Sequence, residues 1–241
     1  MFSLVKRPFV AALFIIFLVA GCQTLPEAKK QDLIFPQQDL SMTNPGWRSC
    51  SFRINWPQES DVRFEVDLLL AHQVIGPILE EYSDSIYRWR FHRRAARDNA
   101  GHQFSFIFYS GSDIAAGIID AVNTSDVKRR LQNSSVIESS TCIPADDSQR
   151  LNISDTSDNQ WPEPIKRHWP TYIMGVSMTW LSLIDDIVAM SVDDDMNIEQ
   201  MVDEYASAEE QVTALWSEYG QHAFLHHLNA VFGYESLLIR Y

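Results

Sequence analysis

Two stretches between residues 87 and 110 carry an aromatic side chain at every second position. Residues 87–92 read YRWRFH, so aromatic rings alternate with cationic groups, and residues 104–108 read FSFIF. A period of two places successive side chains on opposite faces of a β-strand. The segment between them, ARDNAG, is rich in turn-forming residues. Residues 87–110 are therefore predicted to form a β-hairpin with one apolar face.

The segments on either side of this hairpin indicate further strands and helices. Residues 47–56 alternate large and polar residues, which predicts a strand, and residues 135–144 predict another. Residues 59–84 carry apolar residues at helical spacing, with Ser60 or Asp61 as the N-cap and Pro77 expected to kink or split the helix. Residues 111–133 predict a second helix, capped by Ser112 or Asp113.

The resulting order, β-α-β-β-α-β, is that of the ferredoxin-like split βαβ fold of the α+β class. This fold has the sheet order 4-1-3-2, in which the second strand lies at an edge. Charged side chains often protect an edge strand from pairing with other chains. The basic residues of 88–92 are therefore expected on the solvated face of an edge strand. The alternative is an anion-binding site at the hairpin, with the following candidate residues: Arg93, Arg94, Arg97 and His102.

The cysteines test the same strand order independently. Cys50 lies in the first predicted strand and Cys142 in the fourth. These strands are neighbours in the order 4-1-3-2, so we expect a disulfide between them in an oxidising compartment. The alternative is a pair of reduced, buried thiols.

The first 21 residues have the pattern of an exported protein. Lys6 and Arg7 precede an apolar run of 12 residues, 9–20, which suits a signal peptide and is too short to span a bilayer. The segment LVAGC, ending at Cys22, resembles the lipobox of bacterial lipoproteins. The resemblance implies that Cys22 becomes the lipidated first residue, and Gln23 after it implies the outer membrane. The alternative is an ordinary signal peptide with an incidental cysteine.

The remainder divides into a tether and one domain. Residues 22–45 are rich in Gln and Pro and are predicted to form a lipidated N-terminus and flexible tether. Residues 46–241 are predicted to form a single α+β domain, with a helical extension from about residue 161. The extension has no Lys or Arg between Arg167 and Arg240. We expect these acidic helices over the open face of the sheet, near the basic hairpin.

Charge and location together argue against nucleic acid as a partner. The chain has a net charge of −13, and removal of Lys6 and Arg7 with the signal peptide lowers it by two, to −15. Proteins that bind a phosphate backbone are usually basic. The membrane, through the lipid anchor, and an envelope protein or peptide are the expected partners.

Few patterns point to catalysis, and no cofactor is predicted. Glu218, His222 and His226 share one helix face, and two His at i and i+4 can bind the same metal. A polar helix face explains the same pattern without a metal.

Residues 74–110 resemble the C-terminal elimination-type domain of lantibiotic dehydratases and thiopeptide-type biosynthesis proteins. The similar positions are these four: Trp89, Phe91, Arg93 and His102. That family carries arginines after the His, whereas residues 103–106 read QFSF here. The resemblance implies the fold, and the activity is not carried over.

These observations favour a periplasmic, outer-membrane lipoprotein that acts as a non-catalytic binding or accessory module. The alternative is a periplasmic enzyme, with or without a bound metal. It would use His102 with Arg93, or Glu218 with His222 and His226.

Overall fold

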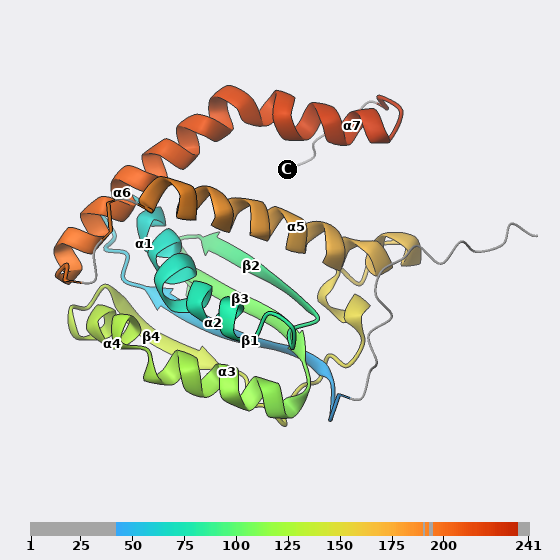
Figure 1. The fold of residues 1–241 in the computed structure, drawn as a ribbon, viewed down its shortest axis with the longest axis horizontal. Helices are drawn as coiled ribbons and strands as arrows, with labels where there is room; N and C mark the ends of the chain where they lie inside the picture. The colour runs from blue at the N-terminus through green and yellow to red at the C-terminus, as the bar shows by residue number, and fades with distance from the viewer. Residues whose placement is uncertain (1–41, 190, 193–194, 236–241) are drawn as a thin grey trace, which may run out of the picture. The chain divides into compact units, whose positions relative to one another are not determined.

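A computed structural model describes residues 42–189, 191–192 and 195–235 of the chain (Figure 1). The predicted signal peptide, Cys22 and nearly all of the predicted tether lie outside these residues. The described residues belong to one compact unit, which begins at Ser41.

Four strands form the sheet, and they occur where the alternating patterns predicted them. The strands are β1 (Gly46–Ile54), β2 (Arg88–Ala95), β3 (His102–Ser110) and β4 (Ile137–Cys142). Their order is β2-β3-β1-β4, and each neighbouring pair is antiparallel. Counted from the β4 edge, the same order reads 4-1-3-2. The α+β class is therefore confirmed.

One face of the sheet, here called the inner face, holds the core. The register places Phe91 opposite Phe106 and Phe52 opposite Phe104, so the aromatic side chains of three strands meet on this face. Phe52, Phe104 and Phe106 are fully buried. Close packing of such rings contributes strongly to core stability. The opposite, outer face carries the polar members of the alternation.

The helices that follow β1 and β3 pack on the inner face (Figure 1). Between β1 and β2 the chain forms α1 (Phe64–Leu69), a π-helical turn η1 (Leu70–Ile75) and α2 (Gly76–Glu81). Pro77 lies in the first turn of α2. Because proline lacks an N–H and clashes with the preceding turn, the wider π turn before it accommodates the ring. The predicted interruption at Pro77 is thus a change of helix type.

The second crossover consists of two helices, α3 (Ser112–Thr124) and α4 (Asp126–Asn133). The sequence predicted a single helix here, and it is broken at Ser125, whose side chain caps α4 by accepting from the N–H of Lys128. The predicted N-caps of the first and second helices are also wrong, since Arg63 and Gly111 occupy those positions without a side-chain cap.

The predicted disulfide connects the neighbouring strands β1 and β4. Cys50 and Cys142 are paired directly across β1 and β4, and their sulfur atoms are bonded. The bond closes a separation of 92 residues.

The C-terminal extension consists of α5 (Glu163–Val188), α6 (Ile198–Leu215), the π-helix η3 (Trp216–His226) and α7 (His227–Val231). A 3₁₀ turn, η2 (Ile153–Thr156), precedes it. The expectation that these helices cover the open face of the sheet is wrong. The α5 helix packs along the free edge of β2, where the N–H of Phe91 donates to Ser177 Oγ at 3.1 Å, and α6 packs against α1. Covering an edge strand satisfies its unpaired backbone groups.

Candidate functional site

Arg93 and His102, two of the predicted site residues, converge on a buried carboxylate. Arg93 lies on the inner face of β2, and His102 begins the neighbouring strand β3. Asp67 projects from α1 and accepts two hydrogen bonds, from Arg93 Nε at 2.7 Å and from His102 Nε2 at 3.0 Å. The side chains of Asp67 and His102 have no exposed surface. The three residues form one polar group at the border of the aromatic core, with Asp67 and His102 fully buried and Arg93 partly exposed.

Aromatic rings fix the geometry of this group. The guanidinium of Arg93 lies between the ring of Phe64, at 4.8 Å, and the ring of Trp180, at 4.9 Å. Trp56 and Phe64 both contact the His102 ring edge-on. Such cation–π and edge contacts hold the side chains in one orientation and keep water away from the Asp67 carboxylate.

The Nδ1 nitrogen of His102 is free to accept a hydrogen bond or a proton. Because an ionised Asp67 is an acceptor, Nε2 carries the proton of a neutral His102, and Nδ1 retains its lone pair. Nδ1 is buried and has no hydrogen-bond partner among the described residues. His102 is among the residues around a cavity of about 290 Å³, although its side chain has no exposed surface; the other residues include Arg53, Trp56, Gln58, Arg97 and Glu138. A carboxylate–imidazole pair beside a cavity can act as a general base.

The other two predicted anion-binding arginines already have internal partners. Arg94 forms an ion pair with Asp98 and donates to the carbonyl of Gly101 at 3.1 Å. Hydrogen bonding from Arg94 lowers the pKa of Asp98 to about 2. Arg97 stacks on Trp56 at 3.4 Å and donates to three carbonyls of the segment 56–60. These contacts stabilise the hairpin and the segment beside it.

The predicted metal-binding residues lie on η3, away from these groups in sequence. The rings of His222 and His226 are stacked, with centroids 5.1 Å apart, and Glu218 is exposed on the same segment. Among the residues that the structure describes, no group of three or more His, Cys, Asp or Glu side chains is arranged to hold a metal ion.

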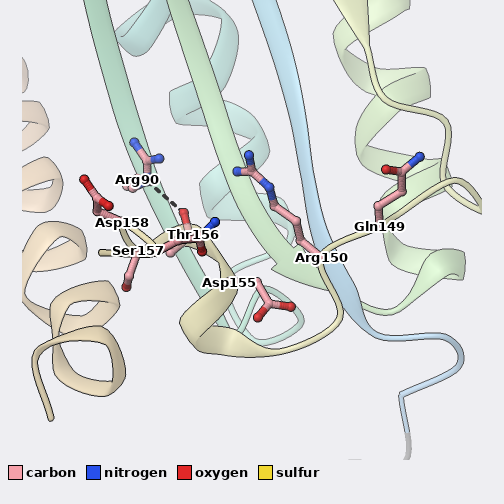
Figure 2. A pocket seen from close by; sticks show the side chains of 8 residues that line it. Arg90, Gln149, Arg150, Asp155, Thr156, Ser157 and Asp158 are labelled. Carbon is pink, nitrogen blue, oxygen red and sulfur yellow. Dashed lines mark hydrogen bonds between the residues drawn. The ribbon is translucent and has the colours of Figure 1, made fainter. Parts of the chain in front are cut away.

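A second cavity, of about 490 Å³, opens on the outer side of β2 (Figure 2). Its lining is entirely polar and comes from β2 and from the segment around η2, as follows: Arg90, Gln149, Arg150, Asp155, Thr156, Ser157, Asp158 and Asn159. Arg90 Nε donates to Thr156 Oγ1 at 3.1 Å. The sequence placed Arg90 on a solvated face but gave no reason to associate it with Arg150.

Asp67 is the member of this polar group that the sequence-based prediction missed. It follows Val66 and precedes three leucines, so it interrupts an apolar run at a position that the helical period assigns to the buried face. A single carboxylate within such a run is a signal for a buried partner, because unpaired charges are not tolerated in a core.

Comparison with known proteins brings no match: no family model matches this chain, and no curated protein or solved structure matches it either. Within the described ranges, the structure contains no helix that is both long and apolar enough to cross a membrane.

Proposed function

We propose that this chain is a bacterial lipoprotein, lipidated at Cys22 and held at the periplasmic face of the outer membrane. It acts there as a non-catalytic binding module for another envelope protein or peptide. We further propose that its sheet belongs to the ferredoxin-like split βαβ class, which the antiparallel order β2-β3-β1-β4 supports.

The observation that carries the binding role is the exposed apolar surface of the C-terminal extension. Of the fifteen large apolar side chains exposed among the described residues, twelve lie in α5, α6, η3, α7 and the turn after α7. They are Ile165, Tyr172, Val176, Met178, Leu215, Trp216, Tyr219, Phe224, Leu225, Val231, Phe232 and Tyr234. Gatherings of exposed apolar side chains with polar surroundings are typical of protein-interaction surfaces.

The charge of the same helices indicates what kind of partner they bind. Residues 168–239 contain twelve Asp and Glu and no Lys or Arg. A partner with an apolar face bordered by Lys and Arg would complement both properties. A second copy of this chain would instead bring two acidic surfaces together, which electrostatic repulsion disfavours.

Site-specific crosslinking in intact cells tests this role. A photo-crosslinking amino acid at Trp216 or Phe232, both more than half exposed, should capture one dominant protein, and peptide mapping should place its contact in an apolar segment flanked by Lys or Arg. The same group at the exposed Arg129 of α4 is the matched control and should capture none of it. Equal capture from all three positions, or none from any, contradicts the proposal.

The lipid anchor is tested separately. We expect the full-length chain to incorporate radioactive palmitate and to sediment with outer membranes, and the Cys22→Ala variant to do neither. Palmitate incorporation by Cys22→Ala would show that the lipobox assignment is wrong. This result would leave the crosslinking test of the C-terminal surface unaffected.

One observation favours a second candidate function, that of a periplasmic enzyme. His102 combines a buried carboxylate partner, an unoccupied Nδ1 and a place in the wall of a cavity. In this role His102 would accept a proton from a substrate hydroxyl or from water, and Asp67 would hold the imidazole in its tautomer. Turnover abolished by His102→Gln, with an unchanged circular dichroism spectrum, is the result this function requires. For the Glu218, His222 and His226 group, no contact in the described residues favours catalysis.

A further inference from the structure

The cavity of Figure 2 holds two arginines with no carboxylate partner among the described residues. Arg90 is partly buried; its Nε donates to Thr156, and its guanidinium lies over the ring of Trp169, at 5.1 Å. Arg150, on the segment before η2, makes no side-chain hydrogen bond or ion pair within the described part of the chain. Burial, and then the charge of Arg150, lowers the pKa of Arg90 to about 10. Two cations therefore share one polar cavity with Asp155 and Asp158, and neither cation forms an ion pair with a described carboxylate.

The two carboxylates of the lining, Asp155 and Asp158, accept hydrogen bonds from backbone N–H groups of their own segment. Asp155 accepts from the backbone N–H of Asn152 at 2.7 Å, which caps η2. Asp158 accepts from the backbone N–H of Gln160 at 2.8 Å. In Figure 2 the carboxylate of Asp155 points away from both guanidinium groups. Neither aspartate forms an ion pair with Arg90 or Arg150 within 4.0 Å.

The hydroxyl groups of the lining add donor and acceptor capacity. Thr156 Oγ1 accepts from Arg90, so its own proton remains available to donate to a ligand. Ser157 donates to the carbonyl of Lys166 at 2.9 Å, so its oxygen lone pairs remain available to accept. Gln149 and Asn159 contribute amide groups that can do both.

We propose that this cavity binds a small phosphate monoester of a polyhydroxy alcohol. The phosphate would lie between Arg90 and Arg150, and the hydroxyl groups of the alcohol would lie against the amide and hydroxyl side chains. A phosphate ester carries a charge of about −1.5 to −2 near neutral pH and three acceptor oxygens, which matches two guanidinium groups and one hydroxyl donor. The volume of about 490 Å³ exceeds that of inorganic phosphate alone, so the ester group has room. This site is independent of the C-terminal surface and of the proposed binding module.

Calorimetry with the full-length protein in detergent, at low ionic strength, tests the site. Glycerol 1-phosphate is the probe, and inorganic phosphate is the comparison ligand that lacks hydroxyl groups. We expect saturable binding of glycerol 1-phosphate that is tighter than that of phosphate. Arg150→Gln and Arg90→Gln should each weaken the binding at least tenfold.

Arg167→Gln is the matched control, because Arg167 is an exposed arginine of α5 outside the cavity. It removes the same charge and should change the affinity less than twofold. Arg150 is exposed, so its variant tests the site even if Arg90→Gln fails to fold. Absence of saturable binding of any phosphate monoester to the wild-type chain, or equal weakening by Arg167→Gln, overturns the proposal.

A phosphate monoester can be soluble or part of a lipid headgroup, and a flotation assay separates the two. Vesicles that contain phosphatidic acid are mixed with the Cys22→Ala chain, in which a lipid anchor cannot cause binding. Flotation that depends on Arg90 and Arg150, with no binding of glycerol 1-phosphate, identifies the lipid ester. Binding of glycerol 1-phosphate without flotation identifies a soluble ester.

Discussion

Arg90 and Arg93 are three residues apart in β2, but they lie on opposite faces of the sheet and have opposite surroundings. On the inner face, Arg93 is paired with the fully buried carboxylate of Asp67 and held between two aromatic rings. On the outer face, Arg90 has a threonine hydroxyl, the ring of Trp169 and a second arginine for neighbours. The β2 strand thus carries one cation, Arg93, that is paired with a carboxylate, and another, Arg90, that is not.

Both side chains are partly buried, and the difference lies in the carboxylate that packs beside each of them. A charge in the core costs several kcal/mol of desolvation free energy, so it persists only with a partner such as Asp67. At the outer face, Arg90 is partly buried and donates to Thr156, whereas Arg150 beside it is exposed, so water and exchangeable anions reach the cavity that the two share. A cation paired inside the fold serves stability, whereas a cation left unpaired at a cavity is free to bind a ligand.

The largest expected effect is that of Asp67→Asn. The substitution removes the buried charge that accepts from Arg93 and His102 and leaves the partly buried Arg93 cation without its ion-pair partner, so we expect a loss of about 3 kcal/mol in the free energy of unfolding. Urea denaturation followed by circular dichroism measures it. The comparison variant is Asp98→Asn, whose ion pair with Arg94 is exposed and should contribute little. Equal losses in the two variants would show that the inner-face group has no special energetic role.

The sequence predicts much of the scaffold, because the signals that define it are local. Alternation in residues 87–92 and 104–108 predicts the hairpin, and the positions of Cys50 and Cys142 predict the contact between β1 and β4. The prediction also brought Arg93 and His102 to one hairpin. It did not place the helical extension, because an amphipathic pattern shows that a helix has a buried face but not which surface covers it.

The cavities depend on contacts that no local pattern encodes. Arg150 lies 60 residues from Arg90, in a segment without sequence periodicity. It reaches the cavity because the segment 145–160 is held against one end of the sheet by hydrogen bonds, among them Trp47 Nε1 to the carbonyl of Ile153 and Tyr109 OH to the carbonyl of Leu151. Likewise, Asp67 meets Arg93 only once α1 is packed on the sheet.

A matched pair of substitutions on β2 gives an intermediate effect. Arg90→Met removes a partly buried cation that no carboxylate compensates, so we expect a change within about 1 kcal/mol of zero, with stabilisation the more consistent sign. Arg93→Met leaves Asp67 buried without its ion-pair partner and should cost about 3 kcal/mol or more. Urea unfolding of both variants measures the contrast. A loss in Arg90→Met as large as that in Arg93→Met would indicate that Arg90 has an internal partner after all.

The smallest expected effect concerns His92, which lies on the outer face between Arg90 and Arg94. Partial burial, and then the charges of Arg90 and Arg94, lowers the pKa of His92 below its usual 6.5. The unfolded chain therefore binds the proton more readily than the folded one. The contribution of His92 to stability is complete above about pH 6.5 and declines as the pH falls toward the folded-state pKa.

The side chain is exposed, so solvent screens the effect and NMR titration of the His92 ring is a better measure than unfolding. We expect Arg90→Met to raise the pKa of His92 toward 6.5, because Arg90 repels the His92 cation more strongly than Arg94 does. The control, Arg53→Met, removes a cation of β1 that is paired with Glu138, and it should leave the titration unchanged. A His92 titration that is insensitive to Arg90→Met would mean that anions or water already screen Arg90. The outer-face cation would then be neutralised by solvent as effectively as Arg93 is by Asp67.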